Sequence, residues 1–217
     1  MSRNNDVVTN AEPAVPADQA LRLSIGSGSE LRRIVRINEE IKSVVATAVK
    51  INLMAMNAIF LAKRAGQAAL GFSVLSHELR RFAGELQQQM TVLRLMTYGS
   101  VGAVTAVVES ERRKRVIDRL KSNASGPVRT VVQGYLRARP GDELGQLKER
   151  MATQHRKLNQ SLADTTQLVE LGSVLARSAK IEAAYGGPFT AALMQVSSDF
   201  EHIIAEIQGR LERISRT

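Results

Sequence analysis

Small and branched apolar residues recur along residues 34–65 in alternating steps of three and four, and this spacing constrains the fold more than any other feature. The positions are Ile34, Ile37, Ile41, Val44, Ala48, Ile51, Ala55, Ala58, Ala62 and Ala65. A seam that repeats every seven residues is typical of long helices packed as a coiled coil. The side chains become smaller towards Ala65, so neighbouring helices can approach closely beside Gly66.

The seam resumes after this glycine, at Phe72, Leu75, Leu79, Phe82, Leu86, Gln89, Leu93 and Met96. Two helical segments on either side of a glycine predict an antiparallel helical hairpin over residues 29–98. Residues 27–30, Ser-Gly-Ser-Glu, have the pattern of a capping box, so we expect the first helix to begin there. The polar residues 1–28, with their prolines and glycines, predict a flexible tail.

A hairpin pattern occurs again in residues 142–217. A shift of 121 positions moves Gly66 onto Gly187 and carries the first seam onto a second, degenerate one. Matched pairs include Ile37 and Leu158, Ile41 and Leu162, Ala55 and Ala176, Ala62 and Ala183, and Leu86 and Ile207. This register favours an internal duplication. Chance similarity between two heptad hairpins is the alternative.

Residues 99–141 predict a helical extension to about Lys121 and a short helix from about 127 to 138. Ser125-Gly126-Pro127 and Pro140-Gly141 provide the breaks. The sequence therefore predicts an all-α fold, namely an elongated antiparallel four-helix coiled-coil bundle. Two long helical hairpins build it, and the short helix connects them at the base.

The residue types exclude several function classes. The chain has no cysteine, and its three histidines, His77, His155 and His202, lie apart without a partner at ligand-like spacing. It has no glycine-rich phosphate loop, no nucleophilic serine motif and no plausible pair of catalytic carboxylates. We therefore expect no catalytic residues, no metal, no cofactor and no small-molecule substrate.

The formal net charge of +9 permits acidic partners but does not select one. The densest basic run is Arg112, Arg113, Lys114 and Arg115, diluted by nearby acidic residues. It is interpreted as a solvated helix face, or as a contact for acidic protein, nucleic acid or anionic membrane. No uninterrupted apolar run of membrane-spanning length and no signal-peptide core occurs, so we expect a cytoplasmic protein.

The first tip also carries polar residues that a heptad does not require. Residues 51–83, INLMAMNAIFLAKRAGQAALGFSVLSHELRRFA, resemble the hairpin tip of the cytoplasmic signalling domain of methyl-accepting chemotaxis proteins. The matching positions are Asn52, Leu53, Ala55, Asn57, Ala58, Ala62, Arg64, Ala65, Gly66, Gly71, Phe72, Val74, Glu78, Arg80 and Ala83. The second hairpin matches weakly, around Ser178–Gly187.

The resemblance implies docking of a chemotaxis-type histidine kinase and its coupling protein, or lateral association with chemoreceptor tips; self-association is a further option. It also implies a place beside membrane receptor arrays. By this likeness the partner-binding residues are Leu53, Met56, Asn57, Phe60, Arg64, Gly66, Phe72, Val74 and Glu78. The second tip would contribute Glu182, Tyr185 and Gly187.

The chain departs from the family at charged positions. Leu61 stands where the family has glutamate, and Lys63 where it has alanine. The second tip keeps Glu182, but Tyr185 replaces the arginine. Such changes invert the local charge and are expected to alter the choice of partner.

Three functions remain open. The leading hypothesis is a soluble chemoreceptor-like scaffold or adaptor that docks through the first tip. The second is a structural or inhibitory decoy without kinase control. The third is a basic helical protein that binds nucleic acid or anionic membrane through residues 112–121 and 129–139.

Overall fold

The computed structural model describes residues 17–123, 126–137 and 143–216 of the 217-residue chain. The helices are α1 (Ala17–Ala65), α2 (Leu70–Asn123), α3 (Pro127–Arg137), α4 (Glu143–Ala183) and α5 (Thr190–Arg216). Two short 3₁₀ helices, η1 (Gly66–Ala69) and η2 (Gly187–Phe189), join α1 to α2 and α4 to α5. No strand occurs among the described residues, which confirms the predicted all-α class.

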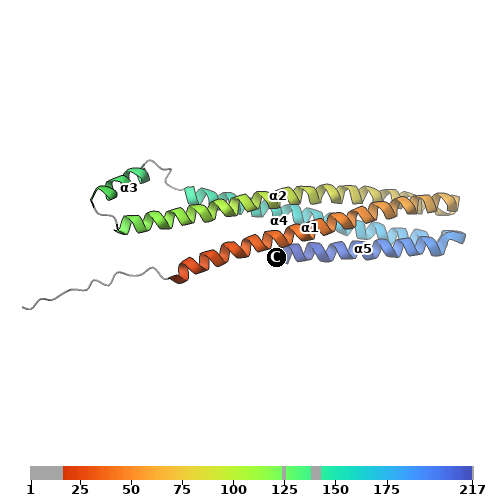
Figure 1. Cartoon of the computed structure of the whole chain (residues 1–217). Coiled ribbons are helices and arrows are strands. Elements are labelled where there is room, and N and C mark those ends of the chain that lie inside the picture. Colours follow the sequence, from red (N-terminus) through yellow and green to blue (C-terminus); the bar gives the residue numbers. More distant parts are fainter. Residues whose placement is uncertain (1–16, 124–125, 138–142, 217) are drawn as a thin grey trace, which may run out of the picture.

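The four long helices lie side by side in Figure 1, with both hairpin turns at one end and α3 at the other. α1 packs against α2 and α5, and α4 packs against the same two helices. The two hairpins therefore contact each other along the long axis. With 54 residues, α2 is about 80 Å long at a rise of 1.5 Å per residue, so the molecule is elongated.

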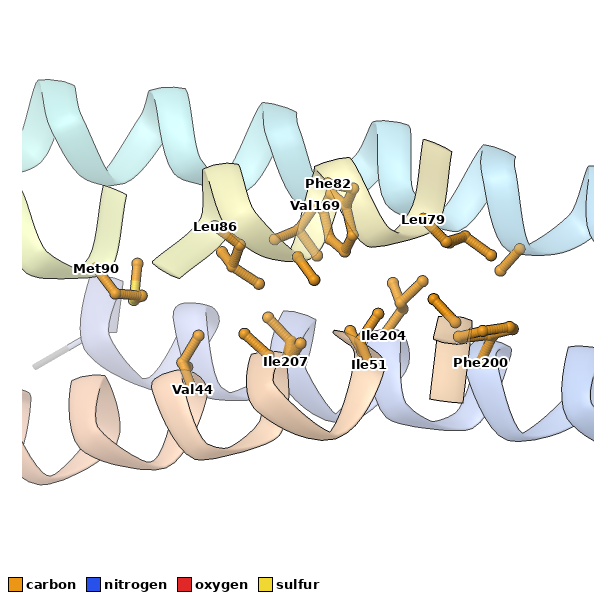
Figure 2. Packing of buried hydrophobic residues seen from close by; sticks show 14 of the residues in the cluster. Val44, Ile51, Leu79, Phe82, Leu86, Met90, Val169, Phe200, Ile204 and Ile207 are labelled. Carbon is orange, nitrogen blue, oxygen red and sulfur yellow. The ribbon is translucent and has the colours of Figure 1, made fainter. Parts of the chain in front are cut away.

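A continuous apolar core lies between these helices and follows the seam predicted for α1. Its α1 members, all nearly inaccessible to solvent, are Ile37, Ile41, Val44, Ala48, Ile51, Ala55, Ala58 and Ala62. Figure 2 shows labelled side chains from α1, α2, α4 and α5 pointing into the shared interior. Burial of apolar surface stabilises a fold by about 25 cal/mol per Å². This seam is what holds the helices together.

The two hairpins bury many of the same positions of the 121-residue register. Buried pairs include Ile41 and Leu162, Ala55 and Ala176, Phe72 and Leu193, Leu79 and Phe200, and Leu86 and Ile207. The correspondence extends to a polar pair, Ser76 and Ser197, which are both fully buried. Each hydroxyl donates a hydrogen bond to the carbonyl four residues earlier, at 2.8 and 2.9 Å.

The seam of α2 differs from the prediction at Gln89, and the predicted seam residues Leu75 and Met96 are only half-buried as well. The sequence places Gln89 on the seam, whereas the structure buries Met90 completely and leaves Gln89 half-buried. A straight helix drifts by about 20° per heptad relative to a strict seven-residue repeat. The apolar residue one position later therefore reaches the core, and no polar side chain interrupts it here.

The first helix begins earlier than predicted, at Ala17 and not at residues 27–30. The residues Ala-Asp-Gln-Ala-Leu-Arg-Leu at 17–23 are mostly strong helix formers. Gly26 and Gly28 cost about 1 kcal/mol each relative to alanine, which a helix of 49 residues can tolerate. The predicted flexible tail is therefore wrong for residues 17–28, and its first 16 residues lie outside the described part.

The base of the molecule is asymmetric. α2 runs on to Asn123, and Gly126, with φ of +61°, turns the chain into α3. α3 begins with Pro127, a favoured first residue of a helix, and packs against α2. α5 has 27 residues against 41 in α4, so α1, α2 and α4 continue past its end (Figure 1).

One stretch has the length and composition to cross a membrane. Residues 29–122 contain an 18-residue window with a mean hydropathy of 1.7, of which 39% is buried inside the fold. The core helix of a soluble protein passes the same test, so this is weak evidence. The expectation that no segment could span a membrane is nevertheless not confirmed.

Candidate functional site

The two hairpin turns each begin with a glycine in the same backbone conformation. Gly66 and Gly187 have φ of +67° and +57°, in the left-handed region that glycine adopts readily. A short 3₁₀ turn follows each glycine before the next long helix begins. A Cβ added at Gly187 would lie 3.9 Å from the Cβ of Ala68, so the two turns adjoin. They form one rounded end of the molecule.

An exposed stripe runs along α1 towards this end. Leu53, Asn57, Phe60 and Arg64 are separated by four, three and four residues, a spacing that puts them on one helix face. Leu53 and Phe60 expose 59% and 60% of their surface. Contact with a partner would remove this apolar surface from water, which is favourable. We call these four residues the first tip face.

Exposed apolar side chains continue on the first turns of α2. Val74, a predicted partner-binding residue, is exposed, and so is Leu70, which the sequence did not single out. The end of the first hairpin thus offers apolar side chains on both of its helices.

Three predicted site residues are less accessible. Phe72 is fully buried in the core and cannot contact a partner directly, so its assignment to the partner-binding set is wrong. It lies on the inward seam of α2, at the position that Leu193 takes in α5. Met56 is half-buried. Glu78 is half-buried too, and its carboxylate forms an ion pair with Arg81 at 2.7 Å.

Glu182 reaches from the second hairpin to the first. A Cβ added at Gly71 would overlap the Glu182 carboxyl group, lying 2.6 Å from its Cδ. Gly71 belongs to the first turn of α2, which contains no acidic residue of its own. A negative charge at the positive end of a helix is worth about 0.3–1 kcal/mol. Glu182 therefore brings a carboxyl group of the second hairpin against the backbone of the first.

The outer face of α4 carries a second exposed stripe. Ile181 and Val174 on α4 are exposed, and Tyr185, in the turn that follows α4, is 72% exposed. The 121-residue shift maps Leu53 onto Val174 and Phe60 onto Ile181, so the repeat could have revealed both residues. We call Val174, Ile181 and Tyr185 the second tip face.

The basic run at residues 112–115 lies far from both tips, near the end of α2. Arg112, Arg113 and Lys114 are exposed and Arg115 is half-buried. Arg113 pairs with Glu143 at 3.2 Å, which removes part of the local positive charge. The run therefore lies on the helix surface, as both of its interpretations require, but it is not part of the tip.

A cluster of ion pairs joins α1 to α5. Arg210 contacts Glu40 at 3.1 Å and Glu206 at 2.8 Å, and Arg213 contacts Glu40 at 2.9 Å. Hydrogen bonds from Arg213 and Arg210 hold the pKa of Glu40 below its ordinary value against the opposing effect of burial. The bond from Arg210 lowers the pKa of Glu206 in the same way. This cluster connects the first hairpin to the second, away from the tips.

Metal ligation has no obvious place in the described part of the chain. Within it, no group of three or more histidine, aspartate or glutamate residues could hold an ion.

One comparison with known proteins identifies a relative. The methyl-accepting chemotaxis protein PctB of Pseudomonas aeruginosa is 32% identical over 84 residues, which are 37% of this chain and 13% of that protein. The chain therefore spans a small part of this relative. No protein-family profile and no solved structure matches the chain. The similarity supports a partial relationship to methyl-accepting chemotaxis proteins and a role related to chemotaxis signalling.

Proposed function

We propose that this chain is a chemoreceptor-like signal-transduction protein that works as a non-enzymatic scaffold or adaptor. Its first tip face would dock a chemotaxis-type histidine kinase, the coupling protein of that kinase, or the tips of chemoreceptors. The observation that carries the proposal is the exposure of Leu53, Phe60 and Arg64 on one face of a segment that resembles the tip of chemotaxis receptors. A cytoplasmic location beside membrane receptor arrays belongs to the same proposal.

We further propose that the fold is an antiparallel four-helix coiled-coil bundle that arose by duplication of one hairpin. The family that the tip resembles uses two chains, each with one hairpin, for such a bundle. Here each long helix packs against two others of the same chain, and both hairpins bury many of the same register positions. These observations support a bundle made by one polypeptide.

The two tip faces are chemically different, which favours docking on one side. Arg64 ends the first face, whereas Tyr185 occupies the corresponding position on the second. A partner with an acidic patch would distinguish the two, since opposite charges steer association and like charges oppose it. We therefore expect one kinase or coupling-protein molecule per chain.

A binding measurement tests this proposal. Binding of the purified chain to a chemotaxis coupling protein and to a histidine kinase is measured for the wild type, Phe60→Ala and Arg64→Glu. Each substitution should weaken binding at least about tenfold, because truncating a central interface residue costs about 2 kcal/mol or more. The partner bound in this assay identifies the docking component.

Two variants far from the tip serve as matched controls. Leu95→Ala removes an equally exposed leucine from α2, and Arg32→Glu makes the same charge reversal on an exposed residue of α1. Both should bind like the wild type. Docking through the first tip face would be rejected if the wild type bound neither partner. It would also be rejected if the control variants lost as much affinity as Phe60→Ala and Arg64→Glu.

The decoy function is the second candidate, and Leu61 and Lys63 favour it. Leu61 packs partly against the core where the family has an acid, and Lys63 is exposed. Kinase activity in a reconstituted receptor array separates the two functions. An adaptor should change activity when added, whereas a decoy should bind the array and dilute its receptors without activating the kinase.

A further inference from the structure

A pocket of about 450 Å³ lies between the end of α2 and the short helix α3, at the end of the molecule opposite the tips. Its apolar lining comes from both helices, with Val116, Ile117 and Leu120 on α2 and Val131 and Tyr135 on α3. Small-molecule sites typically have 300–1,000 Å³ and an apolar lining with a few polar groups. The pocket has this size and this lining.

Among the described residues that line the pocket, the charge comes from two arginines and none is acidic. The guanidinium of Arg113 is paired with Glu143 at 3.2 Å. Arg112 has no ion pair within the described ranges 17–123, 126–137 and 143–216 and is exposed. The described lining therefore combines an apolar wall with one arginine that is outside any ion pair of the described residues, which matches a ligand with a single negative charge.

The order of residues along α2 defines the shape of that ligand. Arg112, Val116 and Leu120 are four residues apart, so they lie along one face of the helix over about 12 Å. The charge is at one end of this row and the apolar side chains follow it. We propose that the pocket binds a monoanionic amphipathic molecule, with its carboxylate at Arg112 and its alkyl or aromatic body over Leu120 and Tyr135.

A helix of a partner protein fits the pocket less well than a small amphipathic molecule does. A helix with its side chains is about 10–12 Å wide, so two turns of it would need roughly twice the available volume. A carboxylate suits the rim because guanidinium forms two parallel hydrogen bonds with it, an arrangement that is strong and directional. This site was not expected from the sequence, and it does not depend on docking at the tips.

Calorimetric titration of the full chain with decanoate, below its micellar concentration, tests the proposal. We expect saturable binding of one decanoate per chain and no comparable binding of decyltrimethylammonium or acetate. The first comparator keeps the chain and reverses the charge; the second keeps the charge and lacks the apolar body. Arg112→Gln should raise the dissociation constant about tenfold, because it removes a hydrogen bond to a charged group.

The matched control is Lys114→Gln, which removes one positive charge from the same helix outside the pocket lining. It should leave the affinity for decanoate within about twofold of the wild type. Val131→Asp places a negative charge in the apolar wall and should abolish binding. Circular dichroism should show unchanged helix content in all three variants, since the substituted residues are exposed.

Equal losses of decanoate affinity in Arg112→Gln and Lys114→Gln would overturn the proposal, because a diffuse basic surface would then explain the binding. Equal affinity for the cationic comparator would also overturn it, as would retention on anionic vesicles without saturable binding of decanoate. Arg112→Gln should bind the chemotaxis coupling protein like the wild type. This last measurement distinguishes a failure of the pocket proposal from a failure of docking at the tips.

Discussion

At the scale of single residues, the contact between Phe82 and Gly172 shows how the second hairpin departs from the first. A Cβ added at Gly172 would lie 2.6 Å from Cζ of Phe82, so the phenyl ring occupies the space of a missing side chain. The 121-residue shift maps Ile51 onto Gly172 and Phe82 onto Ile203. A phenylalanine against a glycine thus corresponds to two isoleucines, of which Ile51 is fully buried and Ile203 half-buried.

This packing predicts opposite effects for two glycine substitutions. Gly172→Ala should lower the free energy of unfolding by about 1–3 kcal/mol, the usual cost of overpacking a core. Gly84→Ala should raise it by about 1 kcal/mol, because alanine favours a helix and the added Cβ would meet nothing within 4 Å. Urea denaturation followed by circular dichroism measures both values. A stabilising Gly172→Ala would show that Phe82 moves aside without cost.

Residue by residue, the sequence predicted in part which of the candidate site residues are exposed. The stripe Leu53, Asn57, Phe60 and Arg64 is exposed, because helical spacing decides which residues share a face. Phe72 was misassigned because a family match does not distinguish residues that contact a partner from those that support them. That distinction depends on the neighbouring helices.

At the scale of helices, α1 and α5 are joined by Glu40, Arg210 and Arg213. The pKa of Glu40 is lower in the folded chain than its ordinary value. The ion pairs therefore contribute their full stability above the ordinary carboxyl pKa. That contribution is lost as the pH falls through the folded pKa and Glu40 takes up a proton.

Glu40→Gln should therefore destabilise the fold at neutral pH by up to about 1 kcal/mol, and the difference from the wild type should vanish in acid. Chemical denaturation at neutral pH and well below the ordinary carboxyl pKa measures it. Glu39→Gln is the control, because Glu39 pairs with Lys42 inside α1 at 2.7 Å and connects no second helix. A deficit for Glu40→Gln that persists undiminished in acid would contradict the assignment to charge.

At the scale of the whole molecule, the apolar core is surrounded by helices of a single chain. α1 and α4 each pack against both α2 and α5, so the seam residues are covered without a second copy. We therefore expect a monomer with an elongated shape. Light scattering coupled to gel filtration should give a mass near 23.7 kDa. An obligate dimer would instead require helices exchanged between chains.

The sequence by itself determined the helices, the inward seam of α1 and the glycine turns. These features follow from periodicity and backbone preference, which act between residues close together in the chain and add up over many turns. The tertiary structure alone decided that Met90 enters the core, that Glu182 lies over Gly71 and that a pocket forms beside Arg112. Each of these depends on which helix faces which, and that is set by contacts between residues far apart in sequence.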